Sequence, residues 1–418
     1  MSNHIIKPFL PLALTMNRFP PELLDTVADN LEKSDLNSMG HTNRVLHSIC
    51  NRRLYKAVTI DNAAQALRFF RTVARSAKCA RLVRELNVAL SLDGVFASFA
   101  RVLRAAASNL TALIIFSIPQ SPQVLNIISG LAFPALRACN LPAFGPNTVS
   151  FLRRHQRLQR LRVFRRGQDS FTTSGSYAPV DLPELTSFCG PAVLVPRLLA
   201  SSPISHLLVN WLGQDIETVD YAALLSTVNK RSGADVHCAV HILGGWQPEI
   251  FMAIAVNSPA LQALCLGTRP GAGGLKVDQR LIDDIAPAMA QLTSLLWIRF
   301  FENTSARDTP DTGTDNKNIL ASELALACRL GELCPRLISC GFGTELHWIR
   351  PYSNVWTPLG IPEGWNEDDL VNVVASNEGL KDVLELGREA VAQAIERIKA
   401  QDLVFQGNVV ELLTFNQS

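Results

Sequence analysis

Apolar residues recur along the chain in a short pattern, L-x-x-L-x-L, that follows an amphipathic segment and a turn. The clearest copies are Leu110-Leu113-Ile115, Leu136-Cys139-Leu141, Leu158-Leu161-Val163, Ile204-Leu207-Val209 and Leu261-Leu264-Leu266. Val83-Leu86-Val88, Leu292-Leu295-Trp297 and Leu337-Cys340-Phe342 fit as well, and Leu185-Phe188 is a degenerate copy. A helical period that alternates with short apolar strands predicts an α/β fold.

The spacing of the copies is that of a repeat. The lead positions 83, 110, 136, 158, 185 and 204 are separated by 27, 26, 22, 27 and 19 residues. These spacings largely coincide with the period of leucine-rich repeats, roughly 20–29 residues. A weak unit around residues 235–242 fills the next gap, and the longer steps to 292 and 337 require insertions. We therefore expect an irregular leucine-rich-repeat solenoid, in which each unit buries its strand and helix against its neighbours. The alternative is a generic α/β domain in which the L-x-x-L-x-L matches are incidental.

A different pattern occupies the stretch from Arg18 to Tyr55. Pro20-Pro21 and Glu22 favour a helix start there. The apolar residues that follow at helical spacing are Leu23, Leu24, Val27, Ala28 and Leu31, then Leu36, Met39, Leu46, Ile49 and Cys50. Helices this short are marginal alone, so we expect a partner or the following domain to cover the apolar stripe.

This stretch resembles an F-box, the module that docks substrate receptors on the Skp-type adaptor of SCF ubiquitin ligases. The matching residues are Phe19-Pro20-Pro21-Glu22-Leu23-Leu24, Leu31, Ser34-Asp35-Leu36, His47-Ser48-Ile49-Cys50 and Arg53-Leu54-Tyr55. The resemblance implies that the adaptor is bound by Pro20, Pro21, Leu23, Leu24, Val27, Leu31, Leu36 and Ile49. The chain departs from the family at Phe19, at Leu46 and at Gly40-His41-Thr42, where good helix formers are usual. An unrelated helical hairpin is the alternative.

An F-box followed by repeats resembles the F-box proteins with C-terminal leucine-rich repeats that are numerous in mushroom-forming fungi. The resemblance implies a non-catalytic substrate receptor of an SCF-type ligase, which binds the adaptor, the cullin-based ligase and a target protein. The rival interpretation is a leucine-rich-repeat interaction scaffold with a degenerate F-box and no ligase role.

The expected domains are a flexible leader at 1–17, an F-box-like module at 18–56, a leucine-rich-repeat solenoid at 57–350 and a C-terminal helical cap at 351–418. Prolines at 351, 358 and 362 interrupt the repeat pattern, and helices are expected at Trp365–Ala375 and Gly379–Leu403. Polar stretches at Asp169–Pro179 and Glu302–Asn318 are expected to be loops.

Arginines crowd the copy of the repeat that begins at Leu158. If Leu158, Leu161 and Val163 point into the core, alternation puts Arg160, Arg162 and Phe164 on the exposed strand face. Forked guanidiniums there suit carboxylate or phosphate groups of a target. The neighbouring substrate-binding candidates on this face are Phe116, Asn140, His206 and Asn210, with Ile114 and Leu208 beside them. A plain solvated face is the other interpretation.

Composition limits the chemistry. The chain has 418 residues, 47% of them hydrophobic and 18% charged, with a net charge of +2. The low net charge argues against nucleic acid or a membrane surface as partner. Nine scattered cysteines without a CxxC pair suit reduced thiols, so we expect a cytoplasmic or nuclear protein.

No catalytic set emerges from the sequence, so we expect no enzyme, no cofactor and no metal. The glycine-rich stretch at 270–276 lacks the spacing and the hydroxyl of a phosphate-binding loop. His237 and His241 would share one side of a strand, but two imidazoles without a third ligand make no metal site.

Overall fold

The computed structural model describes residues 19–359 with gaps at 91–95, 116–121, 142–143, 164–177, 212–219, 230–234, 245–246, 269–276, 303–315, 343–346 and 353–354, and also residues 393 and 400. The chain divides into two compact units, Met1–Pro142 and Ala143–Ser418. Within the described residues, no helix has both the length and the apolar character needed to span a bilayer. The predicted leader at 1–17 lies outside these residues, as do the predicted C-terminal helices apart from Gln393 and Ala400.

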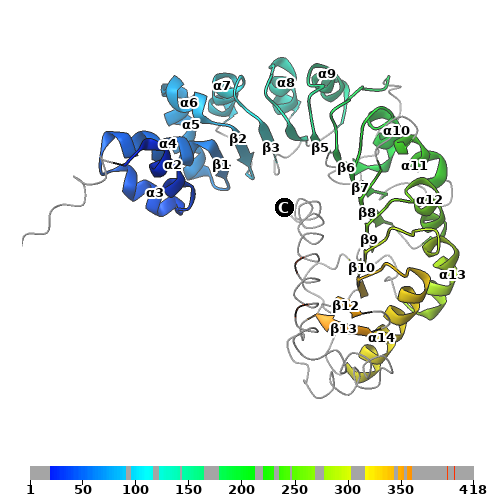
Figure 1. Ribbon diagram of the computed structural model, residues 1–418. Coiled ribbons are helices and arrows are strands. Elements are labelled where there is room, and N and C mark those ends of the chain that lie inside the picture. The colour runs from blue at the N-terminus through cyan, green and yellow to red at the C-terminus, as the bar shows by residue number, and fades with distance from the viewer. Residues whose placement is uncertain are drawn as a thin grey trace, which may run out of the picture. The chain divides into compact units, whose positions relative to one another are not determined.

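Within the described residues, the first unit starts with three helices and continues with alternating strands and helices (Figure 1). Its elements are α2 (Pro21–Asp29), α3 (Lys33–Gly40), α4 (Arg44–Lys56), β1 (Ala57–Ile60), α5 (Ala63–Arg75), α6 (Ala77–Leu82), β2 (Glu85–Val88), α7 (Phe96–Ala106), β3 (Ala112–Ile115), α8 (Pro122–Gly130) and β4 (Ala138–Leu141). The four strands are parallel neighbours in chain order.

No linker separates the third helix from the first strand. Helix α4 ends at Lys56 and β1 begins at Ala57. The Lys56 carbonyl accepts a hydrogen bond from the amide of Arg84 (3.0 Å), which extends the β1–β2 ladder back to the helix end. The ring of Tyr55 also stacks on Phe69 of α5, with centroids 6.2 Å apart. The three-helix segment is therefore packed directly on the first repeat.

The second unit continues the alternation and ends in a hairpin. Its elements are α9 (Pro146–Arg154), β5 (Arg160–Val163), β6 (Ser187–Pro191), η1 (Ala192–Leu194), α10 (Val195–Leu198), β7 (His206–Asn210), α11 (Tyr221–Asn229), β8 (Cys238–Leu243), α12 (Glu249–Asn257), β9 (Ala263–Thr268), α13 (Gln279–Met289), β10 (Trp297–Glu302), α14 (Asn316–Leu333), β11 (Ser339–Phe342), β12 (His347–Tyr352) and β13 (Val355–Leu359). Strands β5 to β11 are parallel, whereas β12 and β13 are antiparallel. Helices α10 to α13 lie along one side of the strands (Figure 1).

The strand register explains why the repeat needs apolar residues at its second and third positions. In the second unit, Leu161, Phe188, Leu207, Ala239, Leu264, Ile298 and Cys340 are aligned across neighbouring strands and buried. A parallel row runs from Val209 through His241, Leu266 and Phe300 to Phe342. Each apolar position thus contacts the same position of the next unit, and the stacked rows form a continuous core.

One predicted copy was placed in the wrong register. The sequence pattern assigned Leu292-Leu295-Trp297, but Ile298 and Phe300 are the residues aligned with Leu264 and Leu266. The copy is therefore Leu295-Ile298-Phe300. A shift by an odd number of residues reverses the two faces of a strand, so Trp297 points to the opposite side from the one expected.

The described start of the predicted C-terminal cap consists of strands, and the helices expected there lie outside the described residues apart from Gln393 and Ala400. The predicted boundary at residue 351 falls inside β12, and prolines 351 and 358 lie in the β12–β13 hairpin. Arg350 fixes this hairpin on α14 by donating to the carbonyl of Gly331 (3.1 Å) and to that of Pro335. Its guanidinium also lies 5.3 Å from the ring centre of Trp356. The buried carboxylate of Glu323 accepts a hydrogen bond from the Trp348 indole (3.0 Å). The cap therefore begins with β12 and β13, and β12 is hydrogen-bonded to α14.

Candidate functional site

The three N-terminal helices, α2 to α4, close around a small core of their own; we call them the three-helix module. Its buried residues are Leu24, Ala28, Leu36, Leu46, Ile49 and Cys50, with Leu31, Met39 and Leu54 packed against them. The side chain of Asn43 caps α4 by accepting from the amide of Leu46 (2.9 Å). The sequence-based expectation that this stretch cannot bury its own apolar residues is therefore wrong in part.

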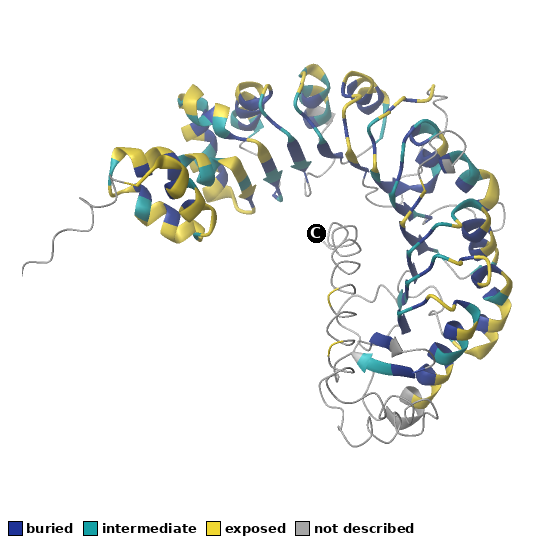
Figure 2. Ribbon diagram, in the orientation of Figure 1, coloured by how far each residue is buried: buried dark blue, intermediate teal, exposed yellow. Residues whose placement is uncertain are grey.

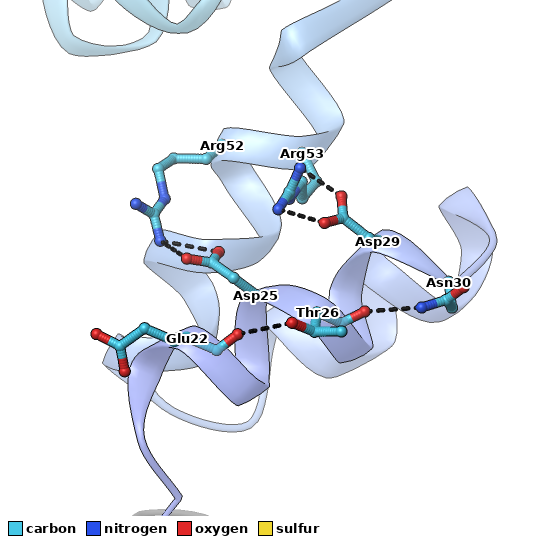
Figure 3. A network of polar contacts seen from close by, with 7 residues as sticks. All are labelled: Glu22, Asp25, Thr26, Asp29, Asn30, Arg52 and Arg53. Carbon is cyan, nitrogen blue, oxygen red and sulfur yellow. Dashed lines mark hydrogen bonds and ion pairs between the residues drawn. The ribbon is translucent and has the colours of Figure 1, made fainter.

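Two ion pairs join the first and last helices of the module. Arg52 of α4 donates to both carboxylate oxygens of Asp25 at 2.9 Å, and Arg53 donates to Asp29 at 2.7 Å (Figure 3). Since all four side chains are at least partly exposed, each pair contributes about 0–1 kcal/mol. Their larger effect is geometric, because a two-pronged contact fixes how α2 lies across α4.

The unusual Gly40-His41-Thr42 sequence forms the turn between α3 and α4. Helix α3 ends at Gly40, and Thr42 donates its hydroxyl to the Met39 carbonyl (2.8 Å). A Cβ added at Gly40 would lie 3.3 Å from the Cβ of Cys50, which is closer than most such contacts. The Gly40 carbonyl also accepts a hydrogen bond from His47 Nδ1 (3.1 Å). The glycine therefore permits close packing of α3 on α4, and the helix-propensity penalty expected from the sequence does not apply.

An apolar stripe remains on the outside of the module. Phe19, Leu23 and Val27 recur at a spacing of four residues and are 52%, 53% and 48% exposed. Val45 at the start of α4 is 49% exposed. Of the seven large hydrophobic residues that are exposed in the described part of the chain, these four lie in or next to the module. We call Phe19, Leu23 and Val27 the outer stripe.

The predicted adaptor-binding residues therefore separate into two groups. Leu24, Leu36 and Ile49 are buried in the core of the module, and Leu31 is partly buried against it. Pro20, Pro21, Leu23 and Val27 are exposed. In Figure 2 the three-helix module carries both buried and exposed stretches of ribbon. Phe19, which the sequence analysis treated as a departure from the family, belongs to the exposed group. Only the exposed group can contact another molecule while the module keeps its fold.

The predicted target-binding face is mostly closed where the structure describes it. Arg160 is exposed, and His206 and Asn210 are half-buried. In contrast, Arg162 is 4% exposed and Asn140 is 6% exposed. Phe116 and Phe164 lie outside the described residues. The expectation that Arg162 projects into solvent is therefore wrong, although alternation placed it on the correct side of its strand.

In the second unit, a hydrophobic cluster lies on the same strand face as Arg162. It consists of Cys189, Leu208, Cys238, Val240, Ile242, Ala263, Cys265 and Trp297, with Phe301 packed beside them. Arg162 is in register with Cys189, which pairs in turn with Leu208. Strands β6 to β10 thus carry apolar residues on both of their faces, as in a sheet that is covered from both sides. A strand face whose side chains are buried cannot serve as an open binding surface.

Burial also sets the chemistry of the charged and thiol groups on this face. Burial lowers the pKa of Arg162 to about 10, which still leaves the guanidinium charged at neutral pH. Burial raises the pKa of Cys189 to about 11 and that of Cys238 to about 12. Both thiols are therefore protonated at neutral pH, and the thiolate that nucleophilic catalysis requires is absent.

The two histidines noted in the sequence lie in different surroundings. His237 is exposed, whereas His241 is 1% exposed and accepts a hydrogen bond at Nδ1 from the indole of Trp211 (3.1 Å). Desolvation lowers the pKa of His241 to about 3, so it is neutral. Among the described residues, no group of three or more potential ligands could hold a metal ion. His241 occupies a core position of its repeat, and the sequence pattern did not reveal this.

No protein-family model matches the chain, and a search of curated proteins found no match.

Proposed function

We propose that this protein is the substrate-recognition subunit of an SCF-type ubiquitin ligase. In this proposal the three-helix module binds a Skp-type adaptor through the outer stripe, and the repeats hold a target protein. The observation that carries the proposal is an exposed apolar stripe on a module whose core is already complete.

The core of the module does not include the stripe, because Leu24, Ala28, Leu36 and Ile49 fill it with other neighbours. Leu23 and Val27, four residues apart, present one side of α2, and Phe19 lies just before this helix. An exposed apolar side is the arrangement of a helix that docks in a hydrophobic groove. Grouped exposed apolar side chains are also characteristic of interaction surfaces, whereas single ones are ordinary. These features support docking of another protein on α2.

The second half of the proposal concerns the target. A receptor of this kind contributes proximity rather than chemistry, since tethering makes the encounter of target and ligase effectively intramolecular. The accessible part of the predicted target face is its edge at the strand starts, where Arg160, Ser187 and His206 are in register. We therefore place target contacts at this edge rather than across the closed centre of the face.

Co-purification tests the adaptor half. Full-length protein is compared with a Leu23→Asp, Val27→Asp variant and with an Ala64→Asp, Ala97→Asp control. The control adds the same two charges at exposed positions in the first turns of α5 and α7, outside the module. We expect the control to retain a Skp-type adaptor and the stripe variant to lose it. If the unaltered protein binds no such adaptor, the proposal fails and an interaction scaffold without a ligase role replaces it.

A further inference from the structure

Helices α5, α6 and α7 of the first unit form a basic helical face. The three helices pack against one another and lie side by side (Figure 1). Their exposed cations are Arg68, Arg71, Arg75, Lys78, Arg81, Arg101 and Arg104. The sequences of the three helices contain no Asp or Glu. Positive charge on these helices is therefore uninterrupted.

The longest helix shows how the charges are arranged. Arg68, Arg71 and Arg75 are three and four residues apart, so they share one side of α5. The buried residues Phe70 and Val73 lie on the opposite side. At about 1.5 Å per residue the three arginines span about 10 Å. One strand of a nucleic-acid duplex carries a phosphate per about 3.4 Å of axis, so this length matches about three phosphates.

No acidic group of the described part of the chain neutralises these cations. Its ion pairs involve other arginines, namely Arg52, Arg53, Arg157 and Arg329. Residues 44–142 contain 13 Lys and Arg against 3 Asp and Glu, although the whole chain has a net charge of only +2. Repulsion among unneutralised cations opposes folding, and a bound polyanion would relieve it.

We propose that the basic helical face binds the phosphate backbone of nucleic acid. Six of its seven cations are arginines, whose planar forks bind phosphate oxygens in pairs. A protein partner would call for an apolar centre, and a membrane would call for inserting side chains. Leu67, at 37% exposure, is the one large hydrophobic residue exposed on these helices. The phosphate backbone needs neither feature, because charge alone supplies most of the affinity.

This inference departs from the expectation of no nucleic-acid partner, which depended on the net charge of the whole chain. A net charge is an average and does not report the face on which the charges gather. The inference does not depend on the proposed ligase role, since it concerns α5 to α7 rather than the outer stripe.

The test is fluorescence anisotropy with a labelled duplex DNA of random sequence and the full-length protein. An Arg68→Glu, Arg71→Glu variant is compared with an Arg280→Glu, Arg336→Glu control, which makes the same charge change at exposed positions of the second unit. We expect the first variant to bind at least tenfold more weakly than the control at about 50 mM salt. Its slope of log K against log salt should also be smaller by about two.

Equal affinity of the two variants would overturn the proposal, as would an absence of DNA binding by the unaltered protein at low salt. Polyglutamate and phosphatidylserine vesicles serve as rival ligands in competition with the DNA. If either binds this face while DNA does not, the partner is an acidic protein or a membrane and the proposal is wrong. Circular dichroism checks folding, and an Arg101→Glu, Arg104→Glu variant replaces the first if that one does not fold.

Discussion

The sharpest test of the outer stripe is the Leu23→Asp, Val27→Asp double variant. Complete burial of a leucine or valine side chain contributes about 1.5–3 kcal/mol. Leu23 and Val27 are already about half covered in the free module, at 53% and 48% exposure. Burying the remainder against an adaptor should therefore contribute about 1 kcal/mol for each residue.

The aspartates add a further cost, because each carboxylate would have to enter an apolar groove. Polar groups buried without a partner cost about 1–3 kcal/mol each in proteins. The total is at least about 4 kcal/mol, which corresponds to a loss of affinity of at least about 1,000-fold. The stability of the module should change little, because neither side chain belongs to its core.

The assay is a titration of purified Skp-type adaptor, paired with urea unfolding of each variant. A Leu24→Ala variant is the internal contrast, since Leu24 is 5% exposed in the core and its truncation should cost about 2–5 kcal/mol of stability. The reasoning is refuted if the double variant binds the adaptor within about tenfold of the unaltered protein. It is also refuted if affinity falls only in proportion to lost folding.

Two further predictions follow from buried positions. Gly40→Leu should destabilise the module by about 1–3 kcal/mol and weaken adaptor binding, because the added side chain meets Cys50; Gly130→Leu, with no atom within 4 Å of its Cβ site, should not. Tighter adaptor binding by Gly40→Leu with unchanged stability would contradict this reasoning. His241 has a pKa of about 3 in the folded protein against an ordinary 6.5, so its contribution to stability is present above pH 6.5 and is lost as the pH falls below it. The free energy of unfolding measured in urea should be about 2 kcal/mol lower at pH 5 than at pH 7. His241→Asn should remove this part of the pH dependence, and His237→Asn, at an exposed position, should leave it unchanged.

Much of the fold could be predicted because the repeat pattern fixes both strand position and facing. Strands β3, β4, β7 and β9 each begin two residues after the leading apolar residue of the predicted copy. The register failed near Leu292, where apolar residues at 292, 295, 297, 298 and 300 allow two alignments. The pairing with β9 decides between them, and that long-range contact has no local signature.

The candidate site could be predicted in part, and the remainder depended on packing. Leu23 and Leu24 are adjacent apolar residues on one helix, yet the first is exposed and the second is buried. The sequence shows that α2 has an apolar side, but where α4 contacts that side is a tertiary property. Arg162 is a comparable case, since strand alternation gave its face correctly but not the apolar cluster that closes this face.

The joint between α4 and β1 has a mechanical consequence. A helix that passes into a strand without an intervening residue, and whose Tyr55 is held against Phe69, has no hinge. Any protein bound to the outer stripe would therefore keep a fixed orientation relative to the first repeats. Rotation at the α4–β1 joint would not average out the orientation of the bound protein. Inserting a few glycines between Lys56 and Ala57 would turn this rigid joint into a flexible linker. The bound protein would stay attached, but its orientation relative to the repeats would no longer be fixed.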